Sequence, residues 1–162
     1  MVGIEQLLAQ WKDNPDILDR ITRWEVMPAT GGNYAGFPAY LDPRLQEVLE
    51  QRGIDRLYSH QAEALEALHR QENVIIVTPT SSGKTLCYNL PVLDSMLADP
   101  DGRAIYLFPT KALSQDQVTD LSGLIKALNT GIKAYTYDGD TEVDLRRSIR
   151  DSGRIIITNP DM

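Results

Sequence analysis

Residues 74–85 read VIIVTPTSSGKT, and this stretch decides the fold. Val74 to Val77 form a continuous β-branched run, which is typical of a strand covered on both faces. The polar segment after it leads into an apolar helical pattern over residues 84–97, in which Pro91 predicts a kink or an early stop. A strand, a short polar loop and a helix in this order predict the first unit of an α/β domain.

The alternation of strands and helices continues toward the end of the sequence. Apolar runs predict further strands at 104–108, 134–137 and 155–158, and the segments between them predict helices at 113–128 and 143–150. Four strands alternating with helices imply right-handed crossovers and a parallel, doubly wound sheet flanked by helices. The last strand ends four residues before the chain does. We therefore expect an incomplete α/β domain that continues in a longer protein.

The first part of the chain predicts short helices joined by irregular segments. Residues 28–43 are rich in proline and glycine, which is typical of a loop. Ser59 is a candidate N-cap for a later helix. Two earlier stretches also show helical spacing. They are residues 4–11 and 43–51. We expect a small, mostly helical N-terminal extension over residues 1–55 and an α/β domain over residues 56–162.

The composition excludes several classes of protein. The 162 residues are 42% apolar and 24% charged, an ordinary globular balance. No run approaches the ~18 apolar residues that a membrane span needs, and no basic, apolar leader starts the chain. The single cysteine, Cys87, excludes an internal disulfide and a multi-cysteine zinc site, and it favours a cytoplasmic location. The net charge of −7 argues against coating nucleic acid with the whole surface, but it allows a local phosphate-binding groove.

The polar segment ends in Gly83-Lys84-Thr85, which is the ending of a phosphate-binding loop. Backbone N–H groups of such a loop and of the next helical turn converge on the β- and γ-phosphates of a nucleotide. Gly83 gives room for close approach, Lys84 supplies a cation, and the Thr85 hydroxyl can complete a Mg²⁺ shell. Thr78 replaces the first glycine of the general pattern. The alternative is a Ser/Thr-rich turn with a solvated lysine.

Together these segments resemble the first RecA-like domain of the DEAD/DEAH-box superfamily 2 helicases, and more narrowly the MrfA/YprA-type DNA helicases. The resemblance covers nearly the whole chain, through RGIDRLYSHQAEAL, VTPTSSGKTLCYNLPVLDSML, AIYLFPTKALSQDQ, YDGDT and IIITNPDM. It implies a RecA-like P-loop NTPase fold and, in the complete protein, an ATP-dependent 3′→5′ DNA helicase with a role in DNA repair. The implied cofactors are ATP and Mg²⁺. The implied partner is single-stranded DNA, or DNA with a single-stranded tail.

The resemblance also implies a nucleotide site. The LYSHQ stretch is similar to a Q motif, which reads adenine in the family, and this assigns adenine recognition to Gln61, whose amide can both donate and accept. Taken alone, Gln61 would be an exposed helical glutamine. Lys84 and Thr85 carry the catalytic roles, and Thr85 binds the metal through the nucleotide. The implied nucleotide-binding residues of the loop are Thr80, Ser81, Ser82, Gly83, Lys84 and Thr85.

Two segments that follow strands are similar to motifs Ia and Ib, which touch the backbone of the bound strand in the family. Hydroxyls, helix-terminal N–H groups and a lysine bind phosphate without reading bases. The alternative for each segment is a capped turn between a strand and a helix. The implied nucleic-acid-binding residues are Pro109, Thr110, Lys111, Thr158, Asn159 and Pro160, with Asp161 next to them.

The stretch Asp138-Gly139-Asp140-Thr141 follows the third of the strands and is first of all a turn or helix cap, although its acids could hold a metal. A basic cluster on the next helix predicts a solvated face rather than a DNA contact. Its members are Arg146, Arg147 and Arg150.

Two parts of the hydrolytic machinery do not occur in these residues. The family draws its Mg²⁺-binding and water-activating carboxylates from a DExH motif on a later strand, and an arginine from a second RecA-like domain. We expect these residues alone to bind nucleotide without turning it over. Two other functions stay open: a nucleotide-gated clamp or translocase that does not separate strands, and a small-molecule kinase. A kinase would leave the PTKAL and TNPD segments unexplained.

Overall fold

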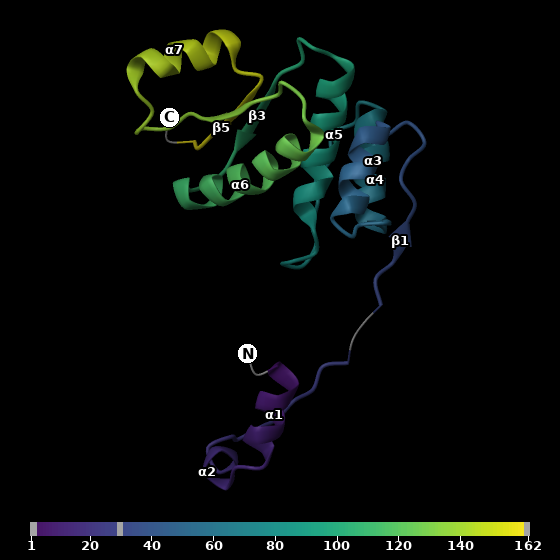
Figure 1. Ribbon diagram of the computed structural model, residues 1–162, viewed down its shortest axis with the longest axis vertical. Helices are drawn as coiled ribbons and strands as arrows, with labels where there is room; N and C mark the ends of the chain where they lie inside the picture. The colour runs from purple at the N-terminus through teal and green to yellow at the C-terminus, as the bar shows by residue number, and fades with distance from the viewer. Residues whose placement is uncertain (1–2, 29–30, 161–162) are drawn as a thin grey trace. The chain divides into compact units, whose positions relative to one another are not determined.

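The computed structural model describes residues 3–28 and 31–160 of the chain (Figure 1). These residues belong to two compact units, Met1–Gly32 and Asn33–Met162. The expected domain boundary between residues 55 and 56 stays a prediction. The second compact unit begins earlier because a helix before residue 55 contributes to its core. Among the described residues, no helix combines the length and the apolar character needed to cross a bilayer.

The first unit contains two helices, α1 (Ile4–Lys12) and α2 (Pro15–Leu18). Neither helix has a buried residue. Asn14 caps α2, because its side chain accepts a hydrogen bond from the Asp16 N–H at 3.0 Å. The unit is therefore a pair of short helices, of which α2 has a side-chain cap, and none of their residues is fully buried.

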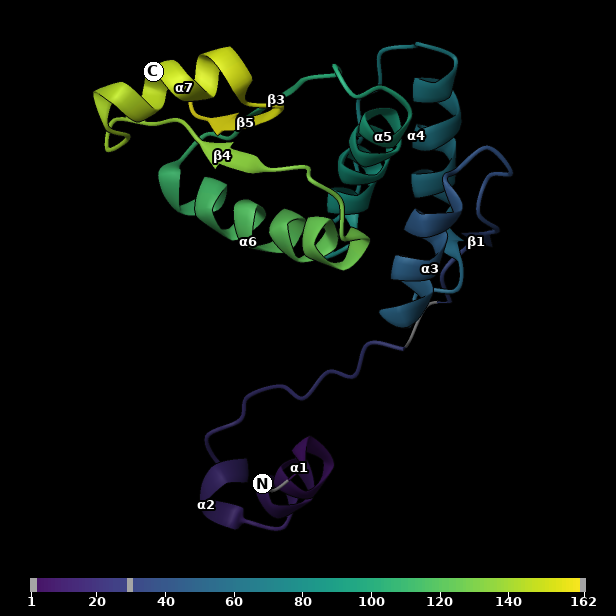
Figure 2. The same ribbon diagram turned by 45° about the horizontal axis from the view of Figure 1, so that its top comes forward.

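Three helices and a short strand pair form one side of the second unit (Figure 2). The strands β1 (Tyr34–Ala35) and β2 (Leu57–Tyr58) pair antiparallel. The helices share one apolar core, to which each of them contributes at least one buried leucine. They are α3 (Pro43–Gln51), α4 (Ser59–His69) and α5 (Lys84–Ala98).

The parallel sheet expected from the sequence is present. Its strands are β3 (Ala104–Leu107), β4 (Ala134–Thr136) and β5 (Ile155–Thr158), in the order β3-β5-β4. The connecting helices, α6 (Lys111–Leu128) and α7 (Val143–Ser152), lie on opposite faces of the sheet (Figures 1 and 2). This arrangement is doubly wound, and it leaves the carboxyl ends of all three strands at one edge.

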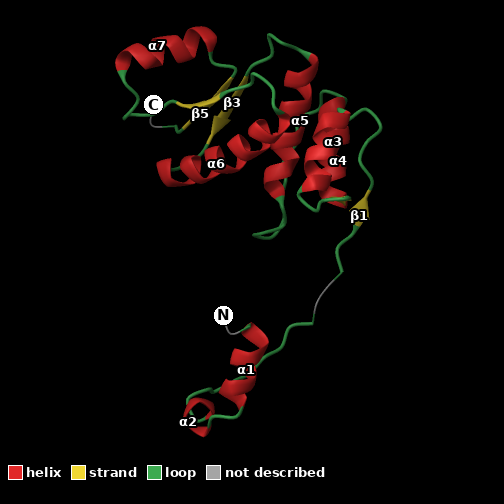
Figure 3. Ribbon diagram, in the orientation of Figure 1, coloured by secondary structure: helices red, strands yellow, loops and turns green. Residues whose placement is uncertain are grey.

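The prediction of a strand from Val74 to Val77 is wrong. The structure has no strand between α4 and α5, and that stretch is drawn as a loop in Figure 3. Ile75 and Val77 are 91% and 89% exposed. The apolar run has the composition of a buried strand, but a strand also needs a neighbour for its backbone hydrogen bonds. No described strand pairs with this segment.

Two expectations about helix ends also need correction. The early stop expected at Pro91 is wrong, because α5 continues through it to Ala98, with Leu90 and Leu93 fully buried on either side. The expected kink stays a prediction. Ser59 is not the N-cap of α4 but its first residue, and Tyr58 is the cap. The Tyr58 N–H donates to the Gln61 side chain at 2.9 Å. The backbone N–H at this end of the helix is therefore hydrogen-bonded by a glutamine and not by a serine.

Candidate nucleotide and nucleic-acid site

The loop before α5 has the backbone shape of an anion-binding loop. Ser81 and Gly83 both lie in the left-handed region, with φ of 62° and 78°. Gly83 is the N-cap residue of α5 and supplies no side chain to the first amides of the helix. The N–H groups at this end therefore have no side-chain cap, and the helix dipole favours negative charge there. These features suit a phosphate group.

Lys84 closes this loop. Its ammonium donates to the carbonyl of Thr78 at 2.9 Å and to that of Pro79 at 2.6 Å. Across the same turn, the hydroxyls of Thr78 and Ser82 lie 2.6 Å apart in a hydrogen bond. A charged phosphate oxygen is a stronger acceptor for an ammonium than a neutral carbonyl. The ammonium of Lys84 therefore already lies at the loop, and a phosphate can replace the two carbonyls as its hydrogen-bond acceptor.

Gln61 reaches the same loop from α4. Its side chain is 2% exposed. The Oε1 atom accepts from the Tyr58 N–H, and the Nε2 atom donates to the carbonyl of Gly83 at 2.8 Å. The alternative interpretation from the sequence, that Gln61 is an exposed residue of the helix, is thus wrong. The structure brings Gln61 against the phosphate loop, while its predicted contact with adenine stays a prediction.

The remaining loop residues are open to solvent. Thr80 and Ser81 are exposed, while Ser82 and Thr85 are half-buried. Thr85 lies in the first turn of α5, next to Lys84. Their predicted roles in binding nucleotide and metal are compatible with this exposure. Cys87, in the following turn, is fully buried, and this burial raises the pKa of its thiol.

The segment after β3 begins α6. Thr110 is the N-cap, and its side chain accepts from the Leu113 N–H at 3.3 Å. Thr110 therefore caps the helix, and its predicted contact with nucleic acid stays a prediction. Lys111 forms an ion pair with Asp140, at 2.8 Å between Nζ and Oδ2, and both side chains are largely exposed. The hydrogen bond from Lys111 lowers the pKa of the Asp140 carboxyl and, in return, raises the pKa of the lysine.

Asp140 belongs to the turn over residues 138–141, which Arg146 holds in place. The Arg146 guanidinium donates to the carbonyls of Asp138, Gly139 and Thr141 at 3.0, 3.0 and 2.8 Å. The expectation that Arg146 points into solvent is therefore wrong. Its planar guanidinium carries several N–H donors, and these bond the three carbonyls that converge on it. The turn expected from the sequence is present, and the described residues contain no group of three or more potential metal ligands.

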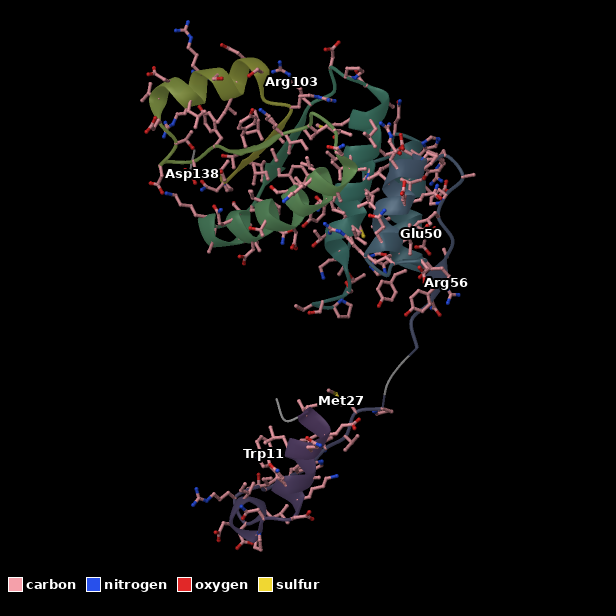
Figure 4. The ribbon with its side chains drawn as sticks, viewed as in Figure 1. Trp11, Met27, Glu50, Arg56, Arg103 and Asp138 are labelled. Carbon is pink, nitrogen blue, oxygen red and sulfur yellow. The ribbon has the colours of Figure 1, made fainter. Side chains whose placement is uncertain are left out.

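Figure 4 shows that Asp138 and Arg103 lie near opposite ends of α7. At the far end, the Arg103 guanidinium donates to the carbonyls of Arg150 and Asp151 at 3.0 and 2.8 Å. Carbonyls at a helix C-terminus lack partners within the helix, so a cation there stabilises it. Arg146 therefore bonds the turn before α7, and Arg103 bonds the carbonyls at its C-terminal end.

The segment after β5 lies beside the segment after β3. Leu107 pairs with Thr158 in the parallel register, and the Phe108 N–H donates to the Thr158 carbonyl at 3.0 Å. The two predicted nucleic-acid segments therefore leave neighbouring strands at the same edge. Asn159 is only 6% exposed, so its burial does not favour the predicted contact, which stays a prediction along with that of Pro160. Asp161 lies outside the described residues.

Comparisons with known proteins agree with this geometry. The DEAD/DEAH box helicase family model matches residues 58–162. The chain is 43% identical to the uncharacterized ATP-dependent helicase YprA of Bacillus subtilis and 40% identical to the ATP-dependent helicase HRQ1 of Saccharomyces cerevisiae. These matches cover 99% and 98% of the chain but only 21% and 15% of the relatives.

A solved structure is similar over almost the same span. The crystal structure of the helicase MrfA bound to DNA and AMPPNP matches 99% of the chain and 22% of its own length, with 43% identity and a TM-score of 0.84. The chain therefore spans about a fifth of the length of this protein and of YprA.

Proposed function

The chain belongs to the DEAD/DEAH box helicase family, and from this premise we propose that it is the nucleotide-binding part of an ATP-dependent DNA helicase. The observation that carries the proposal is the convergence of Gln61, Gly83 and Lys84 on one loop at the start of α5. In that loop, backbone amides bind the phosphates and the Lys84 ammonium neutralises their charge. Mg²⁺, held with the Thr85 hydroxyl, supplies further charge neutralisation at the phosphates.

The sheet edge formed by the ends of β3, β5 and β4 binds the nucleic acid backbone. Lys111 contributes a cation and Thr110 caps the helix whose N-terminus faces that edge. These groups contact phosphates rather than bases, so binding has little sequence preference and weakens with salt. DNA is favoured as the partner because MrfA, which resembles the chain over nearly its whole length, was crystallised with DNA.

Hydrolysis and strand separation test this function in the complete protein that contains these residues. We expect ATP hydrolysis stimulated by single-stranded DNA, together with separation of a duplex carrying a single-stranded tail. Stimulated hydrolysis without strand separation would support the nucleotide-gated clamp or translocase instead. A protein that neither binds nor hydrolyses ATP, with or without DNA, would contradict both.

Substitutions of Lys111 and of Asp140 are expected to change the affinity for DNA in opposite directions. Lys111→Ala is expected to weaken single-stranded DNA binding and to reduce the slope of log affinity against log salt by about one, because one phosphate contact is lost. Asp140→Asn is expected to strengthen binding by about two- to fivefold at low salt, because it releases Lys111 from an exposed ion pair. Fluorescence titrations with labelled oligonucleotides at several salt concentrations measure both effects.

Protonation of Asp140 acts in the same direction as Asp140→Asn. Because Lys111 lowers the pKa of Asp140, the ion pair is complete at neutral pH and is lost only as the pH falls through that lowered pKa. Lys126→Ala, at an exposed position in the last turn of α6, is the matched control. If Asp140→Asn weakened binding as much as Lys111→Ala, the carboxylate would be a ligand of the site and not a competitor.

A further inference from the structure

Tyr88 lies between the phosphate loop and the helix that begins at the proposed nucleic-acid edge. It is one turn after Thr85 on α5. Its hydroxyl donates to Oε1 of Gln117 on α6 at 2.6 Å. Burial raises the pKa of Tyr88, and a hydrogen-bonding contribution from the Thr85 side chain opposes that rise. Tyr88 therefore lies on the helix that carries Thr85, and its hydroxyl has a hydrogen-bond partner on α6.

The ring of Tyr88 also contacts the strand that leads into the same nucleic-acid segment. It meets Tyr106 edge-on, with ring centroids 5.8 Å apart and an interplanar angle of 73°. It lies 6.4 Å from the ring of Phe108, which directly precedes Pro109. Tyr88 thus touches both flanks of the segment from Pro109 to Lys111: the end of β3 before it and α6 after it.

The distances suit a mechanical connection. Thr85 and Tyr88 are separated by less than one helical turn, and Gln117 is six residues from Lys111, about 9 Å along α6. Helices transmit small displacements as rigid bodies, because their backbone hydrogen bonds are saturated and their packed faces have few alternative arrangements. The bond between Tyr88 and Gln117 therefore joins the helix that carries Thr85 to the helix that carries Lys111.

We propose that Tyr88 is a positioning residue whose hydroxyl bond to Gln117 couples nucleotide binding at the start of α5 to nucleic acid binding at the start of α6. The inference rests on the proposed function, because it assigns a link between the two sites named there. Energetic coupling of this kind is reciprocal: nucleotide changes the affinity for DNA by the same factor by which DNA changes the affinity for nucleotide.

Tyr106 provides a matched control in the same aromatic cluster. Its side chain is 8% exposed, and its hydroxyl is buried without a hydrogen-bond partner among the described residues. Tyr106→Phe therefore removes a hydroxyl from the same cluster without removing a bond between helices. Tyr88→Phe keeps the ring contacts with Tyr106 and Phe108 and removes the hydroxyl that bonds Gln117.

The experiment measures four dissociation constants in the complete protein: single-stranded DNA with and without AMPPNP, and AMPPNP with and without DNA. Tyr88→Phe is expected to reduce the coupling factor about three- to tenfold in both directions, while each ligand alone binds within about twofold of wild type. Gln117→Leu is expected to give the same loss, and the double variant no further loss. Tyr106→Phe is expected to leave the coupling unchanged.

Each outcome separates this link from the proposed function. Wild-type coupling in both Tyr88→Phe and Gln117→Leu would overturn the link while leaving the proposed function standing. Equal losses of coupling in Tyr88→Phe and Tyr106→Phe would show that Tyr88 acts only through packing, and this result would also overturn the proposed link. A wild-type protein that binds neither AMPPNP nor DNA would overturn the proposed function and the link together. Thermal unfolding of every variant identifies a global loss of structure, and Gln117→Leu tests the bond independently from the α6 side.

Discussion

Lys84→Ala is expected to abolish ATP turnover by the complete protein, lowering the rate at least about 10²-fold. The Lys84 ammonium is the only lysine or arginine head group that hydrogen-bonds the phosphate loop within the described residues. Without it, the charge that develops on the transferring phosphate has lost its nearest protein cation. The rate of phosphate release at saturating ATP and DNA measures the effect. Strand separation is expected to disappear with it.

The fold should survive this change. Lys84 is half-buried and its two bonds go to carbonyls within its own loop, so alanine removes no contact between α5 and the core. Circular dichroism and thermal unfolding should therefore resemble wild type. Lys126→Ala controls for the loss of a lysine elsewhere and should keep full activity. If Lys84→Ala retained half of the wild-type turnover, the assignment of the phosphate loop would be wrong.

Gly83→Ala is expected to lower nucleotide affinity at least about tenfold, for two separate reasons. The backbone at Gly83 has φ of +78°, a conformation that a residue with a Cβ adopts only under strain. A Cβ there would lie 2.5 Å from Nε2 of Gln61. Gln61 cannot easily withdraw, because it is buried and its other end accepts from Tyr58. Calorimetric titration with an ATP analogue measures the loss.

A second substitution separates the two causes. Gln61→Ala in the Gly83→Ala background removes the clash but keeps the backbone strain. Because Gln61 is also the predicted adenine contact, we compare factors: Gly83→Ala is expected to lower nucleotide affinity by a smaller factor in the Gln61→Ala background than in the wild type. An equal factor in both backgrounds would show that Gln61 does not press on the loop.

Much of the fold could be predicted because burial patterns are local. Ile155 to Thr158 is a continuous apolar run, and it forms the central strand with Ile155 and Ile157 fully buried. The run from Val74 to Val77 is likewise made of β-branched residues but forms no strand. The pattern reports which residues prefer burial. It does not report whether a neighbouring strand is present to pair with them.

The candidate site divides in a similar way. The role of Lys84 could be predicted because the GKT ending fixes it relative to the helix that follows. The bond between Tyr88 and Gln117 could not, because it joins side chains whose proximity depends on the packing of whole elements. The bonds of Arg146 could not either, because they depend on the exact path of the turn before α7, which brings three carbonyls together. Tyr88 and Gln117 are 29 residues apart. Lys111 and Asp140 are separated by the same number of residues, and their ion pair could not be predicted from sequence patterns either.

The central claim is that the loop before α5 receives the phosphates of ATP. A crystal structure of the complete protein with AMPPNP and Mg²⁺ tests it most directly. We predict that the Lys84 ammonium leaves the carbonyls of Thr78 and Pro79 and contacts the phosphate oxygens, with the amides of Gly83 to Thr85 around them. Nucleotide bound elsewhere, with Lys84 still donating to those two carbonyls, would contradict the claim.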